Sequence, residues 1–282
     1  MMAAQPDATV PLTPEPVTPE TVLDAKTLLA RPDLADQALE GLIPAAAYRP
    51  TIAMHAHLAV VDIEASAERG SGRVDQLLFG EVFDVLEREG GRAWGRARRT
   101  GSVGWVEAGG LGRGAPLALF TVSAVDAALP MNALVHHGYS GVPGDALQPA
   151  GDFESDPVAV AERLLGVPHA LGARSSRLTD CSGLVQTALF ACGLACPRHS
   201  DGQALLGVEV ARENLARGDL VVWPAPEGET GFTGHSALVL DATQVIHATG
   251  RHGRVVIESL AEAEARYAAD GFRPPAFRRL DL

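Results

Sequence analysis

The segment LTDCSGLVQTALFACGL, residues 178–194, places an acid, a thiol and a hydroxyl in succession ahead of apolar residues with helical spacing. Thr179 or Asp180 can cap the predicted helix, which leaves Cys181 in its first turn. Unpaired backbone N–H groups and the helix dipole favour a thiolate there, so Cys181 is a candidate nucleophile. The competing interpretation is a small core residue, because most free cysteines are buried.

Two histidines downstream lie in segments that alternate like β-strands, GHSALVL and QVIHAT. A hairpin whose turn is residues 241–243 places Ala237 opposite His247. His235 then faces Thr249, and the two imidazoles share one face of the sheet. A two-residue turn would instead place them on opposite faces. A helix-start thiol, a histidine base and a polar group that orients the base are the components of cysteine nucleophilic catalysis.

The composition indicates a folded protein and excludes several partners. The 282 residues are 46% hydrophobic, enough for a substantial core, and the net charge of −12 argues against nucleic acid or an anionic membrane as the main partner. No apolar run approaches the roughly 20 residues that span a bilayer, and the first residues show no secretory signal. We therefore expect a cytoplasmic protein with reduced thiols, of undetermined oligomeric state.

The chain divides into four predicted regions. They are a leader with short helices (1–49), a small β-barrel (50–112), a reduced second barrel or linker (113–155) and a region that carries the candidate nucleophile (156–282). Within the first region, residues 21–40 are predicted to form one or two short helices that break before Pro32. The spacing Cys192-x3-Cys196-x2-His199 lacks a second ligand pair, so we expect no metal and no other cofactor.

Two of these regions resemble known families. LLFGEVFDVLEREGGRAWGRA with the closing GSVGWV resembles the bacterial SH3-like domains. Over about residues 156–280, the ordered segments GVPHALGARSSRLTDCSGLVQTALFACGL, CPRHSDGQ, ARGDLVVW, GHSALVL and VIHAT resemble the NlpC/P60 cysteine peptidases, a branch of the papain-like fold. The resemblance implies an α+β fold, in which helices pack on an antiparallel sheet, preceded by a small SH3-like β-barrel.

The resemblance also implies a role for individual residues. Cys181 matches the nucleophile, His235 the general base and His247 the group that orients the base. Asp180 and Ser182 match positions that bind the free α-amine of the substrate in members with SH3-like domains.

The segment of the barrel around Trp105 is a further implied substrate contact. Ser102 and Trp105 stand where related enzymes often present a tyrosine to the substrate amine. Trp105 is therefore a candidate substrate-binding residue, although a tryptophan in a small barrel more often belongs to its core.

The implied activity is hydrolysis of the bond between γ-D-glutamate and an L-diamino acid in murein peptides that begin with a free L-alanine. Without an export signal, a role in cell-wall peptide recycling is expected. A non-catalytic murein-peptide-binding protein is one alternative, and an amidase or acyltransferase on the same scaffold is another.

Overall fold

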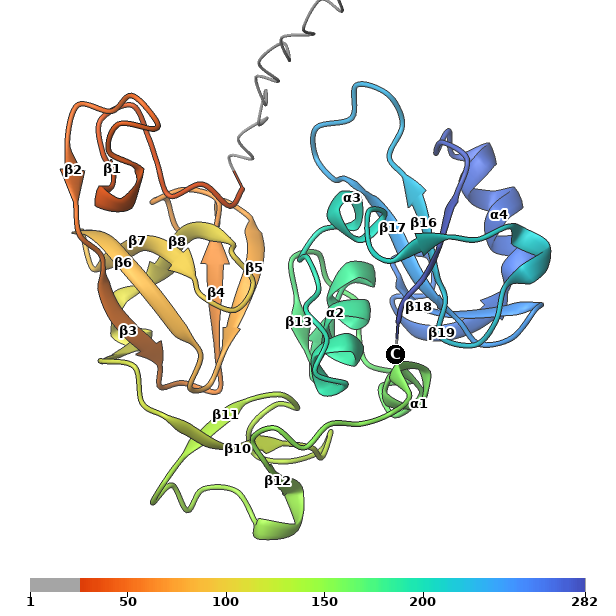
Figure 1. Ribbon diagram of the computed structural model, residues 1–282, viewed down its shortest axis with the longest axis horizontal. Coiled ribbons are helices and arrows are strands. Elements are labelled where there is room, and N and C mark those ends of the chain that lie inside the picture. The colour runs from red at the N-terminus through yellow and green to blue at the C-terminus, as the bar shows by residue number, and fades with distance from the viewer. Residues whose placement is uncertain (1–25, 282) are drawn as a thin grey trace, which may run out of the picture.

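The computed structural model describes residues 26–281 (Figure 1), so the leader expected over residues 1–20 lies outside the described residues. The first described segment contains a parallel pair of short strands, β1 (Ala35–Asp36) and β2 (Tyr48–Arg49), and the 3₁₀ helix η1 (Gln37–Leu39). Residues 26–40 contain no α-helix, so the predicted short helices are wrong over that part. Leu29 and Leu34 are instead buried against the barrel, and this tertiary packing overrides the local helical pattern.

A seven-stranded antiparallel sheet forms the barrel, in the order β5-β4-β8-β7-β6-β3-β9. Its strands are β3 (Ile52–Ala56), β4 (Val60–Glu64), β5 (Arg73–Leu78), β6 (Val82–Glu89), β7 (Arg92–Ala97), β8 (Val103–Glu107) and β9 (Leu111–Arg113), with the 3₁₀ helix η2 (Ala108–Gly110) before β9. Alternate residues point inward and form its core, which includes Ile63, Leu77 and Phe83.

A three-stranded antiparallel sheet follows the barrel. It consists of β10 (Ala118–Val122), β11 (Leu134–His136) and β12 (Leu147–Pro149), with β10 in the middle and the 3₁₀ helix η3 (Gly144–Ala146) before β12. Val122 and Val135 pack against Phe79 at the end of β5, so this small sheet shares a core with the barrel. Figure 1 shows it below the barrel.

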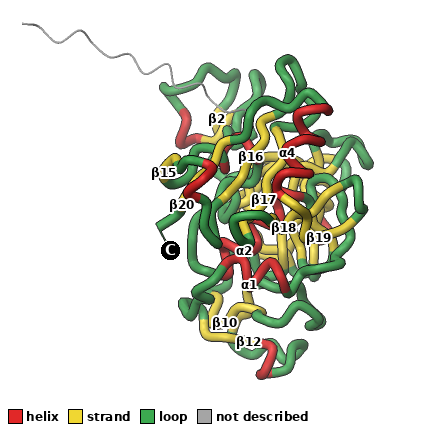
Figure 2. The backbone as a smooth tube through the Cα atoms, turned by 90° about the vertical axis from the view of Figure 1, so that its right-hand side faces the viewer, coloured by secondary structure: helices red, strands yellow, loops and turns green. Residues whose placement is uncertain are grey.

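The rest of the chain surrounds a six-stranded sheet in the order β15-β20-β16-β17-β18-β19. Its strands are β15 (Val208–Glu209), β16 (Leu220–Pro224), β17 (Gly234–Val239), β18 (Gln244–Thr249), β19 (Arg254–Ser259) and β20 (Ala276–Arg279). The helices are α1 (Pro157–Glu162), α2 (Cys181–Ala191), α3 (Ser200–Gln203) and α4 (Leu260–Ala269), with η4 (Arg212–Asn214) and the two-residue strands β13 (Arg174–Ser175) and β14 (Leu178–Thr179). Figure 2 shows β17, β18 and β19 side by side.

Both faces of this sheet are covered by helices. On one face, Leu184 and Leu189 of α2 pack with α1 and with Ile246 of β18. On the other face, Leu260 and Tyr267 of α4 pack on alternate residues of β16, β17 and β18. Among residues 26–281, no helix is long and apolar enough to cross a membrane.

The barrel packs closely against the loop that precedes α2, in the region of the six-stranded sheet. This contact between the two backbones is the seam. Gly172 has φ +74°, and a Cβ atom built on it would lie 2.2 Å from the carbonyl oxygen of Arg73 in β5. Only glycine fits this position without displacing backbone. The Arg73 side chain also donates a 3.1 Å hydrogen bond to the Leu171 carbonyl, which holds the barrel beside the loop that leads to α2.

Candidate active site

Cys181 is the first residue of α2, as the sequence predicts, and Asp180 is the N-cap. The Asp180 carboxylate accepts a 2.7 Å hydrogen bond from the backbone N–H of Gly183. A Cβ on Gly183 would lie 2.3 Å from the Ala173 carbonyl oxygen, so this glycine lets the first turn of α2 approach the neighbouring chain. The N–H groups of Cys181 and Ser182 are in the first turn, where a helix offers no intrahelical acceptor.

The two histidines share one face of the sheet, as the three-residue turn predicts. Leu238 pairs with Ile246 and Val239 with Val245, which is the register that places residues 241–243 in the turn. The ring atoms His235 Nε2 and His247 Nδ1 are 2.8 Å apart. His235 therefore has one ring nitrogen committed to His247 and only Nδ1 left for the substrate side.

The resting thiol is neutral, which differs from the expectation that the helix start favours the thiolate. Burial, and then the negative charge of Asp180, raise the pKa of Cys181 to about 11. Hydrogen bonds from the Ser236 and Ser182 N–H groups and from the Ser200 hydroxyl lower the pKa and offset part of this effect. The helix-start prediction did not include the burial of the sulfur, which is the largest contribution here.

Burial also keeps both histidines neutral. It lowers the pKa of His235 well below 6.5, and the nearby His247 adds to the effect. The pKa of His247 is likewise lowered by burial, although Glu258 opposes that shift. His247 therefore does not favour the charged form of His235 in the resting site, because neither ring is exposed enough to carry a charge without cost.

Two functional neighbours of the histidines were missed by sequence reasoning. Glu258 of β19 lies with its Oε2 atom 2.8 Å from His247 Nε2, and Arg266 of α4 forms an ion pair with the same carboxylate. A charged residue inside the apolar strand RVVIES was the available signal. The register of β18 and β19, in which His247 pairs with Val256, puts Glu258 two residues further along on the same face.

A pocket of about 310 Å³ opens at Cys181. Cys181 and His235 lie in its wall, and His247 lies behind them. Its other lining residues include apolar and aromatic side chains as well as charged and polar ones: Leu171, Phe232, Tyr267, Phe272, His169, Arg251, Arg266, Asp270, Gly234, Thr249 and Gly250. Such a pocket can hold an acyl chain and its leaving amine against the thiol.

The carboxylate of Asp180 is occupied within the protein. Both oxygens accept hydrogen bonds from the Arg198 guanidinium, at 3.1 and 2.7 Å, and the others come from the N–H groups of Gly172 and Gly183 and from the Ser182 hydroxyl. A carboxylate has about four lone-pair sites. These five contacts already fill them, so a substrate ammonium at Asp180 would have to share the carboxylate with Arg198.

Arg198 belongs to a buried charge network that joins the barrel to α2. Its Nε atom is 2.8 Å from Asp75 of β5, and Arg174 Nε is 3.1 Å from the same carboxylate. Arg174 also forms an ion pair with Glu81 of the barrel. Opposite charges balance across this seam, which makes the network a structural link between the two parts of the chain.

Trp105 is not part of this pocket. It is 7% exposed and packs with Leu29, Leu86 and Trp94, with the Arg31 guanidinium 5.7 Å from its ring. Ser102 is also buried, and its hydroxyl oxygen accepts a 3.1 Å hydrogen bond from Thr100. The structure thus brings Cys181, His235, His247, Asp180 and Ser182 together, and it buries Trp105 between the barrel and the first described segment of the chain.

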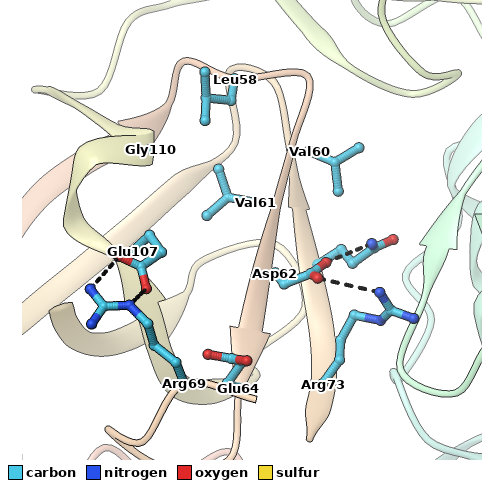
Figure 3. Close-up of a pocket in the computed structure, with 10 residues that line it drawn as sticks. Leu58, Val60, Val61, Asp62, Glu64, Arg69, Arg73, Glu107 and Gly110 are labelled. Carbon is cyan, nitrogen blue, oxygen red and sulfur yellow. Dashed lines mark hydrogen bonds and ion pairs between the residues drawn. The ribbon is translucent and has the colours of Figure 1, made fainter. Parts of the chain in front are cut away.

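A separate hollow of about 510 Å³ lies on the barrel (Figure 3). Its charged side chains are all paired: Arg69 with Glu107, Arg73 with Asp62, and Glu64 with Arg92 outside the hollow. It contains no thiol or histidine. Among residues 26–281, no three histidine, cysteine, aspartate or glutamate side chains are arranged to hold a metal ion.

A thiol at a helix start beside two histidines on antiparallel strands is the arrangement of a papain-like cysteine peptidase domain. Comparison with protein families supports this class. Residues 166–273 match the NlpC/P60 family, and residues 65–111 match the bacterial dipeptidyl-peptidase SH3 domain. The chain therefore contains a domain of the NlpC/P60 family of cysteine peptidases and an SH3 domain of this bacterial type.

Individual relatives agree with this assignment. The chain is 39% identical over 98 residues to the murein DD-endopeptidase MepS/murein LD-carboxypeptidase of Escherichia coli K12, covering 34% of this chain and 50% of that protein. It is 32% identical over 103 residues to a γ-D-glutamyl-L-lysine dipeptidyl-peptidase of Bacillus cereus, covering 36% of this chain and 30% of that protein. The match thus spans half or less of each of these relatives.

A solved structure resembles most of this chain. The crystal structure of an NlpC/P60 family protein from Bacillus cereus ATCC 10987 superimposes with a TM-score of 0.67, covering 80% of this chain and 99% of that one. At 16% sequence identity, this likeness shows a shared fold.

Proposed function

We propose that this protein is a cysteine endopeptidase that hydrolyses the bond between γ-D-glutamate and an L-diamino acid in murein peptides with a free amino-terminal L-alanine. The observation that carries the proposal is that Cys181 and His235 line the same open pocket and that a ring nitrogen of His247 lies 2.8 Å from one of His235. The SH3 domain match and the dipeptidyl-peptidase relative support the choice of bond. Hydrolysis of this bond releases the dipeptide L-Ala-D-Glu, which fits recycling of murein peptides in the cytoplasm.

The geometry supports general-base attack from a neutral resting state. As the Cys181 sulfur attacks the γ-carbonyl carbon, His235 Nδ1 takes the thiol proton. The oxyanion that forms is met by the N–H groups of Cys181 and Ser182 at the start of α2. The His235 imidazolium then gives its proton to the leaving amine, and the thioester remains on Cys181.

Water completes the cycle. His235 accepts a proton from a water molecule that attacks the thioester carbonyl, and the proton returns to the departing sulfur. The released acid is the γ-D-glutamyl peptide, and the free thiol is restored. Both half-reactions use the same base and the same helix-start N–H groups.

The barrel supports the part of the proposal that concerns peptide length. Arg73 of β5 contacts the loop at Leu171, which is a wall of the pocket, so the barrel lies beside one end of the binding site. Because the barrel lies at this end of the binding site, it limits how many residues a bound peptide can have before the scissile bond. The contacts at Asp180 mean that a free amine bound there shares its carboxylate with Arg198.

Cleavage of L-Ala-γ-D-Glu-diaminopimelate, free and N-acetylated, tests the proposal. We expect release of L-Ala-D-Glu from the free peptide by the wild type and by Cys192→Ala, which removes a different thiol from the end of α2. Cys181→Ala should release none. Equal cleavage of both peptides would retain the endopeptidase and remove the amine requirement. Binding without cleavage would favour a murein-peptide-binding protein, and transfer to an added amine would favour an acyltransferase.

A further inference from the structure

Five side chains, the two histidines and three neighbours, close a ring of contacts. His235 Nε2 and His247 Nδ1 are 2.8 Å apart, and His247 Nε2 and Glu258 Oε2 are also 2.8 Å apart. Arg266 donates to both oxygens of Glu258, and its guanidinium carbon is 4.8 Å from the centre of the Tyr267 ring. Tyr267 stacks on His235 with ring centres 4.6 Å apart, which returns to the start of the ring.

We propose that Glu258, held by Arg266, is a positioning residue that determines which ring nitrogen of His235 is free to act as the base. An ionised carboxylate only accepts hydrogen bonds. His247 Nε2 must therefore carry the proton in the 2.8 Å contact with Glu258. The activity readout of this inference rests on the proposed function, whereas its structural readout does not.

The proton positions then follow from one ring to the next. A neutral imidazole with a proton on Nε2 has a bare Nδ1, so His247 accepts at Nδ1. The only donor in that contact is His235 Nε2–H, and His235 Nδ1 is left bare. Nδ1 is the nitrogen that has to take the proton of Cys181. Glu258 thus selects the productive tautomer of His235 through the intervening ring of His247.

Arg266 keeps Glu258 in the acceptor state. Burial alone would raise the pKa of Glu258, but the hydrogen bonds from His247 and Arg266 hold it well below its ordinary value. A protonated Glu258 could donate to His247 Nε2, which would reverse both tautomers. The ion pair also fixes the direction of the carboxylate, since both of its oxygens are engaged by Arg266.

Several titratable side chains lie around this carboxylate. Arg251 and His252 from the loop after β18 and Glu262 from α4 line a hollow of about 600 Å³ together with Glu258 and Arg266. Solvent reaches the outer side of the ion pair through this hollow, while His247 is fully buried behind it. The pH dependence of any variant includes these groups as well as the histidines.

Loss of the orienting carboxylate should lower turnover and leave binding intact. In a Ser–His–Asp triad, an amide in place of the orienting acid favours the wrong tautomer and lowers kcat by about 10⁴-fold. For Glu258→Gln we expect a smaller loss of kcat, about 10- to 10³-fold, because His247 stands between the amide and the base. KM should stay within about twofold, since Glu258 does not line the substrate pocket.

The matched variants separate positioning from general stability. Glu258→Asp keeps an acceptor and should recover part of the activity lost in Glu258→Gln. Glu264→Gln removes a carboxylate of α4 that pairs with Arg212 at the surface, and it should change kcat less than about twofold.

The decisive readout is the ¹⁵N spectrum of the histidine rings in the intact wild-type protein at pH 7. We expect His235 and His247 each to carry the proton on Nε2, and we expect Glu258→Gln to shift this population toward Nδ1. A wild-type His235 protonated on Nδ1 overturns the proposal, as does Glu258→Gln with unchanged kcat. If the wild type cleaves no murein peptide, the proposed function fails while the spectrum still decides the tautomer.

Discussion

The reactivity of Cys181 toward iodoacetamide tests the resting protonation state of the site. The pKa of Cys181 is raised to about 11 by burial and by Asp180, and that of His235 is held well below 6.5 by burial. At pH 7 the resting pair is therefore a thiol beside a neutral imidazole. A preformed thiolate, as the helix-start position alone predicts, would behave differently.

The expected rate follows from the thiolate fraction. A thiol with a pKa of about 11 is ionised to about one part in 10⁴ at pH 7, whereas an ordinary cysteine with a pKa of about 8.5 is ionised to about 3%. The more basic thiolate is intrinsically more nucleophilic, which offsets roughly one order of magnitude. We expect Cys181 to be alkylated at least about tenfold more slowly than a free thiol at pH 7.

The pH profile is the sharper measurement. Between pH 6 and pH 9 the alkylation rate of Cys181 should rise about tenfold per pH unit without a plateau. Peptide mapping by mass spectrometry also follows Cys192, whose pKa is likewise raised to about 11 but which lies at the other end of α2. The two cysteines should show parallel profiles. A plateau at Cys181 below pH 7 that disappears in His235→Ala would refute the neutral resting pair.

Three further perturbations test the seam, the histidines and the barrel. Asp75→Asn leaves the buried Arg174 and Arg198 undercompensated and should lower the free energy of unfolding by about 3–5 kcal/mol, whereas Arg69→Gln at an exposed pair should change it by less than about 1 kcal/mol in urea titrations. The pKa of His247 is lowered by folding, so the unfolded state binds more protons below about pH 6.5 and stability falls as the pH decreases there. In His247→Asn, the free energy of unfolding should depend less steeply on pH, by up to about 1.4 kcal/mol per pH unit, between pH 6.5 and the pKa of His247 in the folded protein. An unchanged slope would contradict the lowered pKa of His247. Trp105→Phe should lower the melting temperature and leave KM within about twofold, while a raised KM at unchanged stability would restore Trp105 as a substrate contact.

Local patterns predicted the parts of the site that depend on neighbouring residues in the chain. The cap at Asp180 and the helix that starts at Cys181 follow from a polar residue ahead of an apolar helical repeat. The shared face of His235 and His247 follows from the turn length, because a strand alternates its faces with every residue. The structure confirms the helix start, and it selects Asp180 over Thr179 as the cap and the three-residue turn over the two-residue turn.

Long-range packing decided the features that were missed. Glu258 reaches His247 only because β19 pairs with β18 in one register, and Arg266 reaches Glu258 only because α4 folds back over the sheet. The contact of Asp75 with Arg198 joins residues 123 positions apart. No periodic pattern in the sequence predicts such pairs, because each partner is an ordinary polar residue in its own segment.

The sequence by itself determined the helix that begins at Cys181, the strand character of the two histidine segments and the class of fold, because each depends on short-range spacing or on ordered motifs. Only the tertiary structure decided the charge state of these groups. Burial of Cys181 and His235 removes the solvent that would stabilise their ionised forms, and this desolvation exceeds the effect of the helix start. The same packing paired Asp180 with Arg198 and buried Trp105 under the segment that carries Leu29, since a side chain's partners depend on what the fold places beside it.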